Sequence, residues 1–137
     1  MAGYSGTPLV KKLGIKQNFN IAFVNAPVGF TRLLDLPSGV KLSSRSQEND
    51  FILFFTKTKR ELETKFSLYS GQLNASGMLW ISWPKKASGV ATDLSENIIR
   101  AIGLANGMVD VKVCAIDDVW SGLKFVFRVI DRERLKR

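Results

Sequence analysis

Three runs of apolar residues stand out along the chain, at positions 21–24, 51–55 and 78–83. β-Branched and aromatic residues are frequent in them, and continuous apolar runs are typical of parallel strands that are covered on both faces. Two later segments, 109–116 and 123–130, come closer to an alternation of apolar and polar side chains, as antiparallel strands with one wetter face do. The pattern predicts a mostly parallel sheet that ends in an antiparallel hairpin.

Helical patterns lie between these strands. Apolar residues recur at every third or fourth position over 62–73, which is typical of one face of a helix that packs on a core. Thr58 and Glu61 form a capping-box pattern at the start of this helix, and Asp93 and Glu96 repeat that pattern before the next one. The alternation of strands and helices predicts the α/β class.

Two segments fit this scheme less simply. The stretch 27–36 predicts a short helix with Phe30, Leu33 and Leu34 facing the core, because Pro27 favours a helix start. Residues 40–43 predict a weak strand, but the polar stretch 43–50 is too short for the helix that a parallel crossover normally uses. The place and direction of this strand are therefore left open.

Length and composition predict a single domain. The 137 residues are 45% hydrophobic and 23% charged, which suffices for one core. We expect one α/β domain over 1–137, with flexible ends at 1–6 and 131–137, the latter either frayed or helical. No apolar run approaches the roughly 20 residues of a membrane helix, and the first residues lack the features of a signal peptide. With a single cysteine, these features predict a cytoplasmic protein without membrane attachment.

The sequence contains no histidine, which removes the commonest general base and the commonest metal ligand. With Cys114 as the only cysteine, a zinc site is not expected either. Cys114 itself fits a small buried residue better than a nucleophile, and Asp117 and Asp118 fit a polar turn better than an acid–base pair. The sequence thus predicts no catalytic residue and no metal site.

The net charge of +8 makes an anionic partner worth testing. Nucleic acid, an acidic protein and a phosphorylated small molecule would all qualify. The basic residues are spread along the chain rather than gathered in one block, so a solvated basic surface explains most of them.

The most function-like segment is WPKKASGV, which begins at Trp83 and follows the third apolar run. In open α/β sheets the binding crevice lies at the carboxyl ends of the strands, where this segment would meet 25–27 and 56–58. Lysine charges, hydroxyl groups, a glycine and free helix N–H groups could together form a cradle for an anion. The predicted ligand-binding residues are Asn25, Thr56, Trp83, Lys85, Lys86, Ser88, Gly89 and Thr92. The alternative is a structural loop with solvated lysines.

No nucleotide fingerprint accompanies this cradle. The segment after the first strand reads Asn-Ala-Pro-Val-Gly from Asn25, and neither G-x-G-x-x-G nor a Walker motif is present. No cofactor is predicted on these grounds.

Several segments together resemble a bacterial family known only as a domain of unknown function, number three thousand and fifty-two. The stretch WPKKASGVATDL is the specific part of the resemblance. The matching segments are 4–9, 12–16, 25–27, 83–94, 110–115 and 120–123. This resemblance implies no activity. The order of elements is also similar to that of a trimmed class I methyltransferase, which implies a three-layer Rossmann-like fold; fold alone does not imply function.

Three functional hypotheses follow. The leading one is a non-catalytic or regulatory module that binds an anionic small molecule or a protein partner at the carboxyl ends of the strands. The second is a transferase-type enzyme that acts on an anionic substrate and uses Lys85 or Lys86 electrostatically. The third is nucleic-acid binding through the basic surface, whose affinity would fall steeply with salt.

Overall fold

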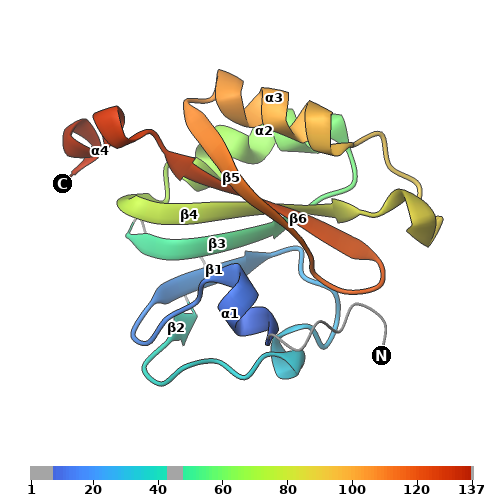
Figure 1. Cartoon of the computed structure of the whole chain (residues 1–137), viewed down its shortest axis with the longest axis horizontal. Coiled ribbons are helices and arrows are strands. Elements are labelled where there is room, and N and C mark those ends of the chain that lie inside the picture. The colour runs from blue at the N-terminus through green and yellow to red at the C-terminus, as the bar shows by residue number, and fades with distance from the viewer. Residues whose placement is uncertain (1–7, 43–47, 137) are drawn as a thin grey trace.

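In the part of the chain that the structure describes, six strands form one sheet in the order β2-β1-β3-β4-β6-β5 (Figure 1). The computed structural model describes residues 8–42 and 48–136. The strands β1 to β4 run parallel to one another, β6 is antiparallel to β4, and β5 is antiparallel to β6. The mostly parallel sheet with an antiparallel C-terminal hairpin is therefore confirmed. The strands are β1 (Asn20–Val24), β2 (Lys41–Leu42), β3 (Asn49–Phe55), β4 (Leu73–Pro84), β5 (Met108–Ala115) and β6 (Trp120–Phe127).

Helices cover both faces of this sheet, as Figure 1 shows. On one face lie α2 (Lys59–Ser70) and α3 (Glu96–Ala105), and on the other lie α1 (Leu9–Leu13) and the segment that contains the 3-10 helix η1 (Thr31–Leu33). The remaining elements are the 3-10 helix η2 (Lys86–Ser88) and α4 (Val129–Leu135). In the described part of the chain, no helix has both the length and the apolar character needed to cross a membrane.

The run 51–55 shows why both faces must be covered. Ile52 and Phe54 point into the cluster beneath α2 and α3, whereas Phe51, Leu53 and Phe55 point into the cluster beneath α1. All five side chains are at most 1% exposed, because side chains alternate between the two faces of a strand. The continuous apolar run 51–55 therefore belongs to a parallel strand that is covered on both faces, as predicted.

The strand whose place was left open is β2. It pairs in parallel with β1 through Asn20–Lys41 and Ile21–Leu42, and it lies at the edge of the sheet. Residue 43, which was included in the predicted strand, lies outside the described residues.

The segment between β1 and β2 differs from the predicted helix. It makes only the short 3-10 turn η1 and becomes extended at Leu34. As a result Phe30 and Leu34 are buried, while Leu33 is 76% exposed, so its predicted inward orientation is wrong.

The two ends of the domain were predicted to be flexible. Residues 1–6, predicted to be flexible, lie outside the described part. Most of the predicted flexible end at 131–137 belongs to α4, and its half-buried Leu135 packs against the core cluster beneath α2 and α3.

Candidate functional site

A cleft opens at the carboxyl ends of β1 and β3. The two strands are neighbours, but the chain continues from β1 to β2 on one side of the pair and from β3 to β4 on the other. Ligands of open α/β sheets bind at such a switch in strand order. The cleft measures about 510 Å³, a size typical of small-molecule sites. Its lining residues are Asn25, Pro27, Phe55, Lys57, Glu61, Val90, Val119 and Trp120.

Glu61 supplies the carboxylate of this cleft. Its backbone N–H donates to the Thr58 hydroxyl oxygen over 3.1 Å, and this cap starts α2 directly beyond the end of β3. Its Oε1 accepts a hydrogen bond from the hydroxyl of Thr56, which is 2% exposed, and its Oε2 accepts one from Nδ2 of Asn25 over 3.4 Å. These bonds hold the carboxylate at the mouth of the sheet rather than over the helix terminus.

Asn25 ties the two strand ends together. It follows β1 with a φ of 58°, in the left-handed region that asparagine adopts more readily than most residues. Besides its bond to Glu61, its Nδ2 lies 3.3 Å from the carbonyl oxygen of Phe55 at the end of β3. The side chain of Asn25 therefore fixes the sharp turn after β1. A glycine-rich loop at this place would make the turn with its backbone alone.

An aromatic wall closes another side of the cleft. The rings of Phe55 and Trp120 meet edge to face, with centroids 5.1 Å apart. Trp120 is held in place by the hairpin turn, where Oδ1 of Asp117 accepts hydrogen bonds from the backbone N–H groups of Val119 and Trp120, each over 2.8 Å. Asp117 thus has a structural role in the turn, as predicted.

The hydroxyl groups of Ser88 and Thr92, two members of the predicted anion cradle, form hydrogen bonds with backbone groups. The Ser88 hydroxyl donates to the Lys85 carbonyl oxygen over 2.6 Å and accepts from the N–H of Val90 over 3.1 Å. The Thr92 hydroxyl donates to the Lys57 carbonyl oxygen over 2.6 Å and accepts from the N–H of Leu94. These bonds shape the loop and bring Val90 to the cleft.

The other members of the cradle lie apart. Trp83 is 7% exposed and packs in the core cluster beneath α2 and α3 rather than in the cleft. Lys85 is half-buried, Lys86 is exposed, and Gly89 has a φ of 76° with open space around it. The structure thus brings Asn25 and Thr56 together at the cleft. An anion-binding role for the lysines stays a prediction.

A carboxylate from the same loop caps a different helix than expected. Asp93 accepts a hydrogen bond from the backbone N–H of Lys59 over 2.7 Å, at the start of α2. The cap of α3 is Ser95, which accepts from the N–H of Ile98. The loop is therefore fastened to α2 by Asp93 as well as to Lys57 by Thr92.

Sequence reasoning missed several lining residues. Lys57 lies in the predicted segment 56–58 but is not among the predicted ligand-binding residues, and the sequence pattern indicates Glu61 only as a capping residue. The signal for Glu61 was available, because a charged residue in the first turn after a buried strand lies near the carboxyl end of that strand. Trp120 reaches the cleft from the hairpin, more than 60 residues away along the chain from Phe55.

Other chemistries find little support. Among residues 8–42 and 48–136, no group of three or more acidic or cysteine side chains could hold a metal ion. Cys114 is half-buried on β5, and burial raises the pKa of its thiol against the opposing effect of Lys12 and Lys112.

We expect Cys114 to be alkylated several-fold more slowly in the folded protein than in the protein unfolded in urea. The raised pKa lowers the thiolate fraction at pH 8, and thiolate is the reactive form. Mass spectrometry of iodoacetamide-treated samples over time would measure both rates. Equal rates in the two states would show that the thiol is as reactive as a free cysteine.

The comparisons with known proteins place the fold. No family model and no curated protein matches the chain. Solved structures do match. One is a SAM-dependent methyltransferase from Aquifex aeolicus, with a TM-score of 0.62 and 13% identity over 85% of this chain and 86% of that one. Another is magnesium protoporphyrin IX methyltransferase from Synechocystis with bound SAM, with a TM-score of 0.57 and 12% identity over 88% of this chain and 74% of that one. A third is a fibrillarin pre-rRNA processing protein from Methanococcus jannaschii, with a TM-score of 0.57 and 13% identity over 82% of this chain and 68% of that one.

The chain has the Rossmann-like fold of methyltransferases. At such low identity the likeness establishes the fold alone, and it bears out the predicted three-layer architecture. It also corrects the leading functional hypothesis. The solved structures that share this fold include S-adenosylmethionine-dependent enzymes, so the expectation of a non-catalytic module is contradicted and the transferase alternative is favoured.

Proposed function

We propose that this protein is a methyltransferase that binds S-adenosylmethionine in the cleft between β1 and β3 and acts on an anionic substrate. The observation that carries the proposal is the pairing of a carboxylate and an aromatic wall at the switch in strand order of a methyltransferase-type sheet. Glu61 supplies the carboxylate, and Phe55 and Trp120 supply the wall.

The residues of the cleft fit this cofactor chemically. S-adenosylmethionine carries a positive sulfonium, an ammonium and a carboxylate, and when bound it supplies an activated methyl group. Carboxylates and the faces of aromatic rings both attract cations, which suits Glu61 and Trp120. The ammonium group of Lys57, also on the lining, suits a carboxylate.

The chain departs from class I methyltransferases after β1, where it lacks their glycine-rich loop and reads Asn-Ala-Pro-Val-Gly from Asn25. The turn that the loop would make is achieved here by Asn25 in the left-handed conformation. Its amide also fixes Glu61, so the same residue turns the chain and orients the carboxylate.

The loop 85–94 borders the cleft and carries the charge for an anionic substrate. Val90 lines the cleft, and the bonds from Thr92 and Asp93 to the start of α2 fix the loop beside it. Lys85 and Lys86 lie at the start of this loop. Their ammonium groups would attract an anion toward the cleft, which is how fixed charge steers substrates.

Replacing Glu61 with glutamine is expected to weaken S-adenosylmethionine binding by about tenfold, or roughly 1.4 kcal/mol. The change should affect S-adenosylhomocysteine less, because that product has lost the sulfonium charge. Glutamine keeps an oxygen that can accept from Thr56, so the fold should survive. Isothermal titration calorimetry with both ligands measures the ratio of the two affinities directly.

Matched variants sharpen this test. Glu63→Gln removes an exposed charge from the same helix and should change neither affinity, whereas Lys57→Gln should weaken both ligands because both carry the carboxylate. The proposal is wrong if wild-type protein binds neither ligand, or if Glu61→Gln leaves the preference between the two unchanged.

A further inference from the structure

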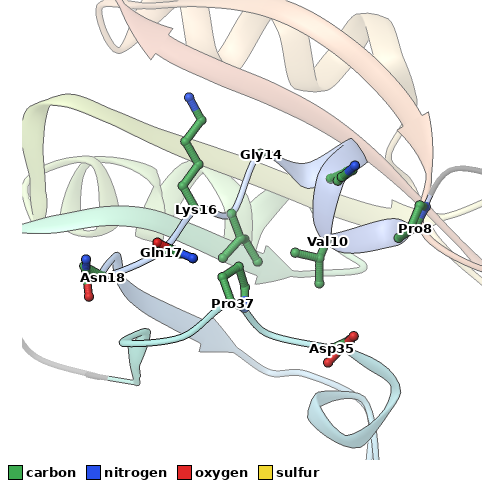
Figure 2. Close-up of a pocket in the computed structure, with 10 residues that line it drawn as sticks. Pro8, Val10, Gly14, Lys16, Gln17, Asn18, Asp35 and Pro37 are labelled. Carbon is green, nitrogen blue, oxygen red and sulfur yellow. The ribbon is translucent and has the colours of Figure 1, made fainter.

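A second, larger pocket lies at the opposite end of β1 (Figure 2). It measures about 800 Å³ and is formed by α1, the turn that precedes β1 and the segment that precedes β2. Figure 2 shows Val10 of α1 and Pro37 of the segment before β2, two of the side chains that line it. None of its lining residues belongs to the cleft described above. The lining consists of Pro8, Val10, Lys11, Gly14, Ile15, Lys16, Gln17, Asn18, Asp35 and Pro37.

The lining divides into an apolar floor and a charged rim. Val10 and Ile15 are 8% and 4% exposed, and with the half-buried Pro37 they form the floor. Lys11 and Lys16 contribute two positive charges to the rim, against one negative charge from Asp35. A concave apolar surface with a few polar groups at its edge is typical of small-molecule sites.

Positive charge continues beyond the rim onto the hairpin. Nζ of Lys124 on β6 lies 3.9 Å from the position that a Cβ on Gly14 would occupy. Burial lowers the pKa of Lys124, and the nearby charges of Lys112 and Lys16 lower it further. Within the described residues, Lys16, Lys112 and Lys124 form no ion pair. The pocket therefore opens beside ammonium groups that repel one another. A bound anion would reduce this repulsion.

We propose that this pocket binds a small amphipathic carboxylate, with its hydrocarbon part on the floor of Val10 and Ile15 and its carboxylate at Lys16. The apolar floor alone would accept any hydrocarbon. The excess of lysine over acidic groups at the rim selects against cationic and neutral head groups. The site is independent of the proposed methyltransferase activity, since the two lining sets share no residue.

Titration calorimetry with octanoate, octanol and octylammonium tests the head-group selection, because the three ligands share one chain and differ in charge. Octanoate should bind at least about tenfold more tightly than octanol, and octylammonium should bind most weakly. Equal affinity for octanoate and octanol would overturn the proposal, because it would leave only the apolar floor.

Two substitutions with opposite expected effects on octanoate affinity test where the carboxylate of the ligand binds. Lys16→Gln should weaken octanoate binding by about tenfold, and Asp35→Asn should strengthen it several-fold, because Asp35 repels the head group. Lys65→Gln, an exposed lysine on α2 at the other face of the sheet, should leave the affinity unchanged. Unchanged affinity in both Lys16→Gln and Asp35→Asn would reject this site. Loss of octanoate binding in Lys57→Gln would place the ligand in the cleft and reject this site too.

Discussion

Replacing Trp80 with alanine is expected to lower the free energy of unfolding by about 3–5 kcal/mol. The indole is fully buried in the middle of β4, in the cluster beneath α1. Its Nε1 donates a hydrogen bond to the carbonyl oxygen of Leu13 over 3.0 Å, and this bond joins residues 67 positions apart. The substitution would leave a cavity and remove the donor that satisfies the last turn of α1.

Trp80→Phe separates the two contributions. It keeps most of the packing but removes the hydrogen bond, and a buried acceptor left without its partner costs about 1–3 kcal/mol. Urea denaturation followed by far-ultraviolet circular dichroism measures both variants, and Trp120→Phe at a half-buried position should cost less than either. A Trp80→Phe protein as stable as wild type would mean that the hydrogen bond to Leu13 contributes nothing.

Replacing Gly103 with alanine is expected to destabilise the protein by about 1–3 kcal/mol, although alanine favours helices. A Cβ at this position of α3 would overlap the ring of Phe125 on β6. That ring cannot easily retreat, since it is fully buried and packs edge to face on Phe66 of α2, with ring centroids 5.4 Å apart. Gly103 is therefore required for the close approach of α3 to the sheet.

A double-mutant cycle with Phe125→Leu tests whether overlap with the Phe125 ring causes this loss of stability. If overlap with the ring is the cause, Gly103→Ala should cost less in the Phe125→Leu background than in wild type, with a coupling of about 0.5–3 kcal/mol. Thermal denaturation of the four proteins gives the coupling. Strict additivity would show that the two residues do not compete for space.

Much of the fold could be predicted because its strands differ in burial. The run 51–55 is apolar at every position, which is typical of a strand covered on both faces. The segment between β1 and β2 could not be predicted as well. It contains one 3-10 turn, and which of its leucines is buried depends on the extended backbone at Leu34 rather than on a helical period.

The candidate site was predictable in place but not in composition. Asn25 and Thr56 were expected at the carboxyl ends of the strands, and they lie at the cleft because that edge follows from strand direction. The partners of Ser88 and Thr92 are backbone N–H and carbonyl groups, which leave no trace in the sequence. Glu61 satisfies only half of its capping box, since its carboxylate binds Thr56 instead of the Thr58 backbone.

The sheet order also has a consequence for synthesis of the chain on the ribosome. Strand β6 lies between β4 and β5, although both of these are made before it. Until residues 120–127 have emerged, β5 lacks the strand it pairs with, and one edge of β4 presents unpaired backbone groups to other chains. The nascent protein therefore carries an open sheet edge at its apolar centre until the hairpin closes, which is the interval in which a chaperone would matter most.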